Sequence, residues 1–73
     1  MFALKYRAIG LKISYYRKRK GLTQAQLAEL IGISTNYLGM IERGNNGQSY
    51  SMEVLLKLAE ALDVDAQELM REN

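Results

Sequence analysis

The chain has 73 residues, a formal net charge of +2, and neither cysteine nor histidine. Folding at this length buries only about 60% of the unfolded chain's surface, so we expect residues 1–73 to form one small domain. Without cysteine or histidine the chain lacks the ligands of the usual zinc sites and the residues of a disulfide scaffold, and we expect no metal ion and no cofactor. These absences, and the lack of a glycine-rich phosphate loop, also argue against an enzyme.

No segment resembles a targeting signal. The first twenty residues hold seven Lys or Arg and lack the uninterrupted apolar core of a secretory signal peptide. No run approaches the ~18 apolar residues of a membrane-spanning helix. The sequence therefore predicts a soluble protein of the reducing cytoplasm without a membrane partner.

Charge is distributed unevenly along the chain. Residues 1–23 contain seven Lys or Arg and no acid, whereas the other 50 residues contain three Lys or Arg against eight acids. One end of the molecule is thus basic and the other acidic, a polarity that orients a protein toward a polyanion. A solvated basic helix has the same pattern, so charge alone does not establish nucleic-acid binding.

A first helix is predicted over residues 6–20. Ile9, Ile13 and Tyr16 recur at helical spacing, and Gly21 stands where a left-handed residue ends a helix. The apolar residues upstream extend the same stripe, so the N-terminal segment is either an extension or the start of this helix.

Two short helices are predicted next, one from a Thr23 cap to about Ile31 and one from Thr35 to Arg43. Thr23 and Gln26 form a capping box, and Ser34 is a good N-cap for the second of these helices. A connection of only three residues sets two helices at ~90 to 120°. The corner is expected to be filled by small and apolar side chains, namely Leu27, Ala28, Ile31, Ile33, Leu38 and Ile41.

Two further helices follow in the acidic part of the chain. Ser51 caps the fourth, whose apolar stripe consists of Val54, Leu55, Leu58, Ala59 and Leu62. Asp65 and Glu68 form a capping-box-like pair at the start of a fifth helix, from Ala66 to about Arg71. No segment has an alternation of apolar and polar residues long enough to predict a strand. We therefore predict an all-α fold, a compact five-helix bundle in which the second and third helices form a helix-turn-helix.

The central part of the chain carries a recognisable pattern. Residues 21–44 read Gly-Leu-Thr-Gln-x-x-Leu-Ala-x-x-x-Gly-Ile-Ser-x-x-Tyr-Leu-x-x-Ile-Glu-Arg-Gly. This pattern closely resembles the helix-turn-helix of the Cro/cI-repressor (XRE-like) family. The resemblance continues upstream through Ile9-Gly10-x-Lys12-Ile13 and Arg17, and downstream through Leu55-x-x-Leu58-Ala59-x-Ala61-Leu62-x-Val64, and covers about residues 9–70. It implies a lambda-repressor-like DNA-binding fold and a sequence-specific transcriptional regulator, expected to be a repressor, that binds double-stranded operator DNA. Such a protein is expected to be associated with the nucleoid.

The resemblance also implies that the third helix enters the major groove, where the N-terminal positions of a recognition helix meet base edges. Asn36 is expected to pair with adenine, Thr35 to contact a base edge or a phosphate, and Met40 to lie against a thymine methyl group. Ser34 begins this helix and belongs to the same DNA-binding set. A solvated surface helix would carry similar Thr and Asn residues. The outward face is expected to comprise Thr35, Asn36, Gly39, Met40 and Arg43.

Contacts to the DNA backbone are expected on both sides of this helix. Gln24 opens the preceding helix, where the family uses an equivalent glutamine on a phosphate, although ordinary helix-start chemistry is an alternative. Tyr37 is expected to be half core residue and half phosphate ligand. Arg43, Asn45 and Asn46 follow, and are expected to bind the next phosphates.

Arg17 and Glu42 are charged, yet they occupy positions that face the interior. The family pattern implies a partly buried ion pair that ties the first helix to the third. Glu42 is therefore expected to be a structural acid and not a catalytic one.

Three features depart from the family pattern. Gly39 replaces a common serine, which removes one polar contact and lowers helix propensity by ~1 kcal/mol relative to alanine. Residues 45–51 form a longer and more polar loop than the family's proline-serine loop. Residues 1–8 have no counterpart, and their apolar side chains extend the first helix, pack on the core or contact another chain.

A homodimer on an inverted repeat is the expected form on DNA. One such domain discriminates only a few base pairs, and two-fold symmetry doubles the site with recognition helices about 34 Å apart. The expected interface is at the acidic end, with Leu56, Val64, Leu69 and Met70, although Leu69 has the alternative of closing the core. The alternative function is an antitoxin-like or other protein-interaction module built on the same fold.

Overall fold

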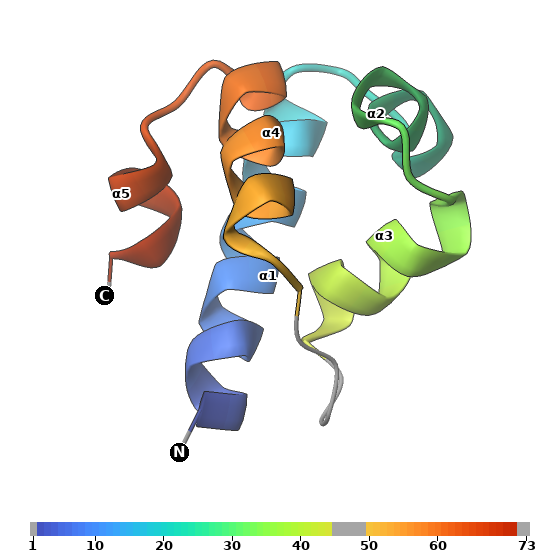
Figure 1. Cartoon of the computed structure of the whole chain (residues 1–73). Helices are drawn as coiled ribbons and strands as arrows, with labels where there is room; N and C mark the ends of the chain where they lie inside the picture. The colour runs from blue at the N-terminus through green and yellow to red at the C-terminus, as the bar shows by residue number, and fades with distance from the viewer. Residues whose placement is uncertain (1, 45–49, 72–73) are drawn as a thin grey trace.

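The computed structural model describes residues 2–44 and 50–71, with side chains described from residue 5 onward. Within these ranges the chain is helical and contains no strand (Figure 1). The helices are α1 (Phe2–Arg19), α2 (Gln24–Ile31), α3 (Thr35–Arg43), α4 (Met52–Leu62) and α5 (Ala66–Met70). The prediction of an all-α fold with five helices is confirmed, and no helix in the described ranges combines the length and apolar composition needed to cross a bilayer.

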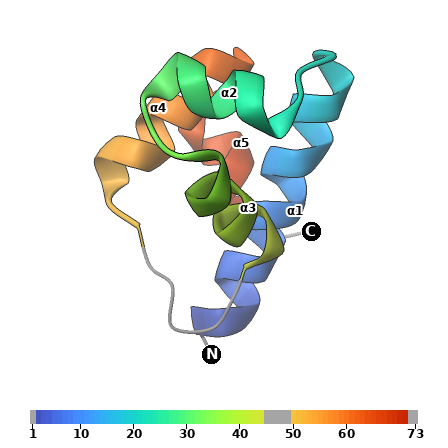
Figure 2. The same cartoon turned by 90° about the vertical axis from the view of Figure 1, so that its right-hand side faces the viewer.

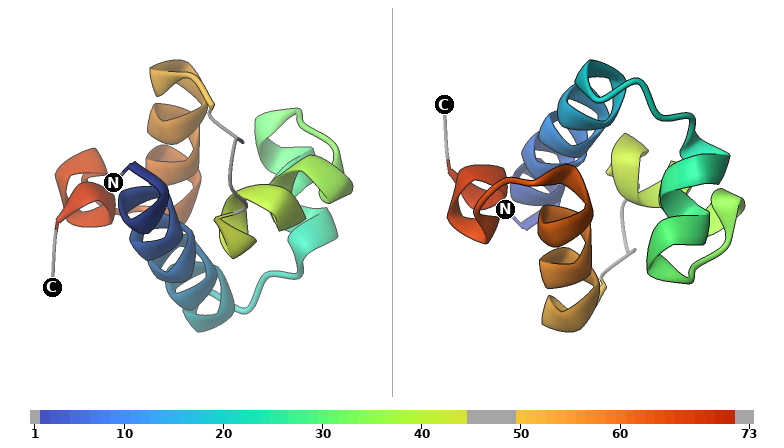
Figure 3. Two further views of the ribbon diagram at one scale, coloured as in Figure 1. Left: turned by 90° about the horizontal axis from the view of Figure 1, so that it is seen from below. Right: turned by 90° about the horizontal axis from the view of Figure 1, so that it is seen from above.

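The helix-turn-helix and α5 lie on opposite sides of the molecule. Figure 2 shows α3 at the front, with α2 above it and α1 behind. The two views of Figure 3 place α1 and α4 in the middle, the α2–α3 pair on one side and α5 on the other. The long α1 thus contacts α3, α4 and α5 and connects the two sides.

The first helix begins at Phe2, so the N-terminal residues form its first turns. It ends at Arg19, and Gly21 just beyond it has a φ of 77°, the left-handed conformation expected there. Gly10 allows α1 and α3 to approach closely, because a Cβ at this position would lie 2.5 Å from the Ile41 carbonyl oxygen and 2.6 Å from that of Glu42. The packing of α1 on α3 therefore requires glycine at residue 10.

Caps fix the start of α2 and the turn between α2 and α3. The Thr23 hydroxyl accepts from the Gln26 backbone N–H at 3.0 Å, and the Gln26 side chain accepts from the Thr23 N–H at 2.9 Å, which confirms the capping box. Gly32 ends α2 with a φ of 79°, and the Ser34 hydroxyl accepts from the Tyr37 N–H at 3.0 Å. Local hydrogen bonds therefore determine where α2 stops and α3 starts.

The start of α5 differs from the prediction. Asp65 makes no side-chain cap hydrogen bond, so the proposed pairing with Glu68 is wrong. The Glu68 carboxylate instead accepts from the Tyr16 hydroxyl at 2.9 Å, and this hydrogen bond raises the pKa of Tyr16. Lys12 Nζ donates to the Glu68 carbonyl oxygen at 3.2 Å and to that of Arg71. A cation at a helix C-terminus satisfies free carbonyl groups, so polar contacts hold this short helix on α1.

The core is formed by side chains from every helix. Its buried members are Ile13, Leu27, Ala28, Ile31, Leu38, Ile41, Leu55, Leu58, Ala59, Leu62 and Leu69. Ile33 and Val54, also expected inside, are half-buried against this cluster. Leu69 is fully buried and belongs to the core, which removes it from the expected dimer interface.

Candidate nucleic-acid interface

The outer side of α3 presents a polar stripe. Thr35, Asn36 and Arg43 are exposed and Met40 is half-buried. Asn36, Met40 and Arg43 are separated by four and three residues, so they occupy one face of the helix. The structure therefore places Asn36 and Met40, which the sequence predicted for base contact, on the same face as Arg43, which it predicted for phosphate contact.

Gly39 does not belong to this outer face. It is buried, and a Cβ built on it would lie 3.3 Å from Arg43 Nη1 and 3.7 Å from Gln24 Oε1. The side chains of Gln24 and Arg43 thus cover Gly39. The prediction that it is outward-facing is wrong, because helical spacing locates the residue but cannot show that two long side chains lie over it.

A buried polar network lies directly behind this surface. Arg17 Nε donates to Glu42 Oε2 at 2.6 Å, and Arg17 Nη2 donates to Glu42 Oε1 at 3.1 Å. Both residues are only 8% exposed, which confirms the predicted buried pair between α1 and α3. Arg17 Nη1 also donates to the Leu22 carbonyl oxygen at 2.8 Å. These bonds fix α3 relative to α1 and to the turn before α2.

Gln24 joins the same network. Its side-chain Nε2 donates to Glu42 Oε1 at 3.0 Å. The residue is half-buried, and its amide links the first turn of α2 to α3. No local sequence pattern indicates this contact, because Gln24 and Glu42 are 18 residues apart and meet only in the folded chain.

The remaining predicted residues lie around α3. Tyr37 is half-buried and packs against the core, as expected for its ring, while Ser34 is exposed with its hydroxyl engaged as the N-cap. Asn45 and Asn46 lie outside the described residues. The basic residues 18–20 are exposed at the end of α1 and contribute positive charge beside the helix-turn-helix.

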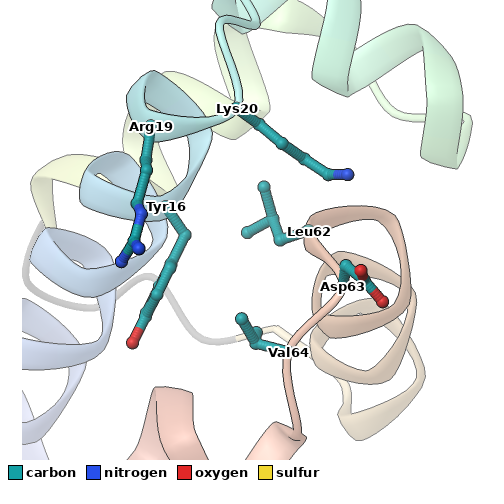
Figure 4. Close-up of a pocket in the computed structure, with 6 residues that line it drawn as sticks. All are labelled: Tyr16, Arg19, Lys20, Leu62, Asp63 and Val64. Carbon is teal, nitrogen blue, oxygen red and sulfur yellow. The ribbon is translucent and has the colours of Figure 1, made fainter.

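An open hollow lies away from α3, between the end of α1 and the turn joining α4 to α5 (Figure 4). It is lined by Tyr16, Arg19, Lys20, Leu62, Asp63 and Val64. Its charged side chains carry both signs, and the Tyr16 hydroxyl already donates to Glu68. None of the residues predicted for direct DNA contact lines this hollow.

A family model decides the classification of this chain. The helix-turn-helix model HTH_3 matches residues 13–69. The chain belongs to this helix-turn-helix family. The resemblance to XRE-like regulators and the lambda-repressor-like fold predicted from residues 9–70 are thereby confirmed.

Individual relatives agree with this family assignment. The transcriptional regulator SinR of Bacillus subtilis is 41% identical over 64 residues, which are 88% of this chain and 57% of that protein. The restriction-modification controller protein C.AhdI from Aeromonas hydrophila is 39% identical with a TM-score of 0.80, covering 88% of this chain and 94% of that one. A crystal structure of SinR in complex with DNA is 40% identical with a TM-score of 0.78, covering 86% and 98%. The chain thus spans little more than half the length of the SinR relative.

Proposed function

We propose that this chain is a sequence-specific, double-stranded DNA-binding transcriptional regulator that inserts α3 into the major groove. The observation that carries the proposal is the outer stripe of Asn36, Met40 and Arg43 on a helix held from behind by the buried Arg17–Glu42 pair. A recognition helix must be held rigidly to place donors and acceptors against base edges. The likeness to a DNA-bound SinR domain supports this assignment.

Base recognition is assigned to the N-terminal half of α3. Asn36 is exposed and free to form a bidentate pair with adenine N6 and N7. Thr35 contacts a base edge or phosphate, and Met40 lies against a thymine methyl group. Ser34 belongs to this set through its place at the helix start, where backbone N–H groups attract a phosphate.

The DNA backbone is bound by residues on either side of α3. Gln24 and Tyr37 flank the helix, and Asn45 and Asn46 follow it in the chain. Arg43 contributes a cation to the same surface. The basic residues 1–23 add long-range attraction, because each phosphate neutralised releases counterions. Affinity thus comes from charge around α3, and sequence preference from α3 itself.

The dimer on an inverted repeat is part of the proposal. Leu56 is 52% exposed and Met70 40% exposed, on α4 and α5, and Val64 between them is half-buried. These apolar side chains lie on α4, on α5 and in the turn that joins them, so two copies that meet there leave α3 free for DNA. Occupation of a promoter by such a dimer blocks polymerase, and we propose repression without cofactor or enzymatic activity. Because its target is chromosomal DNA, we place the protein in a prokaryotic cytoplasm.

Selection from a random duplex pool tests the proposed function. The 73-residue chain is mixed with duplexes that contain a randomised central segment, and bound molecules are recovered and sequenced over several rounds. We expect an enriched motif with two-fold symmetry and half-sites about one helical turn apart. Recovery of no motif would contradict the proposal and favour a protein-interaction module on the same fold.

A further inference from the structure

The glycines of this chain differ in what the fold demands of them. Gly10 is required by the close approach of α1 and α3, and Gly44 combines a φ of 63° with the Arg7 Cα only 2.5 Å from a built Cβ. Gly39 meets neither condition. Its φ is not positive. The atoms nearest to a Cβ built on it are the ends of the flexible Arg43 and Gln24 side chains.

Glycine is therefore a costly choice at residue 39. After proline it is the least favourable residue in a helix interior, and an alanine Cβ would require only a few tenths of an ångström of movement by the flexible Arg43 side chain. Packing and backbone conformation thus do not explain why a glycine stands in the middle of α3. The effect of having glycine at residue 39 is instead seen in the position of the Arg43 side chain, which lies over it.

The missing side chain at residue 39 leaves room for Arg43. Side chains on a helix point back toward its N-terminus, and Arg43 Nη1 lies 3.3 Å from the position of the absent Cβ, one turn back along α3. The guanidinium therefore lies over the middle of the helix, beside the Gln24 amide and on the stripe shared with Asn36 and Met40. It does not extend past the end of α3 toward the following loop.

The Arg43 guanidinium also has its hydrogen-bonding capacity available. Among the described residues it forms no ion pair and donates no hydrogen bond, in contrast to Arg17, which donates to both carboxylate oxygens of Glu42 and to the Leu22 carbonyl oxygen. A planar fork of N–H donors on the groove-facing side of a recognition helix matches guanine, whose O6 and N7 both accept in the major groove. A phosphate would be reached more directly from an arginine that points away from this stripe.

We propose that Arg43 reads a guanine in the major groove and that Gly39 is a positioning residue that leaves the guanidinium room to do so. This inference rests on the proposed DNA-binding function and changes the role expected of Arg43 from phosphate contact to base readout. Glycine at residue 39 then contributes to specificity through the arginine one turn away, without contacting DNA by a side chain of its own.

The test repeats the selection from the random duplex pool with Arg43→Lys and with the matched variant Arg19→Lys. Lysine keeps the charge and loses the planar fork, so we expect Arg43→Lys to reduce the preference for guanine at one position of each half-site by about tenfold or more. Affinity for random duplex should stay within about twofold, because the number of cations is unchanged. Arg19→Lys, at the exposed end of α1, should leave every position unchanged.

Gly39→Ala tests the positioning role in the same assay. We expect a higher melting temperature together with a several-fold weaker guanine preference at that same position, and no further weakening when Gly39→Ala is added to Arg43→Lys. A guanine preference that survives Arg43→Lys, or an equal loss at every position, would overturn the inference while leaving the proposed function intact. A wild-type pool without any motif would instead overturn the proposed function, and the inference with it.

Discussion

Arg17 Nε lies 2.6 Å from Glu42 Oε2, and the other oxygen of this carboxylate accepts from both Arg17 and Gln24. One buried acid thus links α1, the first turn of α2 and the end of α3. Two of its partners come from helices other than the recognition helix, so the carboxylate fixes the orientation of α3. A buried ion pair contributes little to net stability when intact, but its loss leaves an uncompensated charge.

Glu42→Ala should therefore destabilise the domain severely. Breaking a buried pair costs about 3 to 5 kcal/mol, which is comparable to the whole free energy of unfolding of a small domain. Glu60→Ala is the matched control, because Glu60 is exposed on α4 and its removal should change the free energy of unfolding by less than about 0.5 kcal/mol. Thermal or urea unfolding measures both, and equal melting temperatures would refute the structural role of the pair.

Replacing Gly10 in α1 and Gly39 in α3 by alanine should change the free energy of unfolding in opposite directions. Gly10→Ala forces the backbones of α1 and α3 apart and should lower the free energy of unfolding by about 1 to 3 kcal/mol or more. Gly39→Ala meets only flexible side chains and should raise it by up to about 1 kcal/mol. Urea unfolding compares the variants with the wild type, and destabilisation by both would show that α3 tolerates no Cβ at residue 39.

Tyr50 should be replaceable by phenylalanine with a gain in stability. Its ring packs edge-on against Tyr6 at 5.4 Å, while its hydroxyl is buried without a hydrogen-bond partner in the described part of the chain. Tyr50→Phe keeps the ring and removes a desolvated hydroxyl, so we expect a gain of about 1 kcal/mol. Tyr15→Phe is the control, because it removes the hydroxyl of an exposed tyrosine and should not give the same gain in stability.

The same variant should alter the alkaline unfolding profile. Burial raises the pKa of Tyr50 from its ordinary value of 10.0 to about 12. Because the folded state favours the neutral phenol, its contribution to stability is complete below pH 10 and is lost as the pH rises toward 12. Stability measured across this window should fall less steeply in Tyr50→Phe, with a residual slope from Tyr16, whose pKa the Glu68 hydrogen bond also raises. Identical slopes would contradict a buried neutral Tyr50.

Asn36→Ala should relax sequence preference without unfolding the protein. Asn36 is exposed, so stability should change little, while loss of a bidentate pair should cost about 1 to 3 kcal/mol on the selected site. Affinity for random duplex should remain near the wild-type value. Titration of both duplexes by fluorescence anisotropy measures the difference. An equal loss on the two would assign Asn36 to the DNA backbone.

Leu56→Glu should weaken dimerisation while leaving the monomer folded. Leu56 is exposed on α4, so a charge there costs the monomer little but places two like charges at the proposed interface. Sedimentation with the selected inverted repeat should then show a single copy bound at concentrations where the wild type binds two. Leu30→Glu, a change at another exposed leucine, this one on α2, is the control and should retain two copies. Two copies with Leu56→Glu would place the interface elsewhere.

The fold was predictable because its local signals agree with one another. Thr23, Ser34 and Ser51 each precede a helix and each accepts a backbone N–H, while Gly21 and Gly32 end helices in the left-handed conformation. These features depend on residues within a few positions of each other. The spacing of apolar residues then fixes which face of each helix enters the core.

The errors arise where the outcome depends on contacts between distant segments. Glu68 resembles a capping residue locally, but Tyr16 competes for its carboxylate from 52 residues away. Gly39 lies on the outer stripe by helical spacing, but the Gln24 side chain from α2, together with that of Arg43, covers it. The outer face of α3 and the Arg17–Glu42 pair behind it were therefore predictable, whereas the contact of Gln24 with the Glu42 carboxylate required the folded structure.

The affinity of the wild-type chain for its selected duplex, compared with a scrambled duplex of the same composition, tests the central claim most directly. Both dissociation constants are measured at one fixed salt concentration near physiological ionic strength, because phosphate contacts make binding strongly salt-dependent. We predict that the selected duplex binds about 10³-fold more tightly or better, as specific readers of the major groove do. Equal affinity for the two duplexes would contradict sequence recognition by α3.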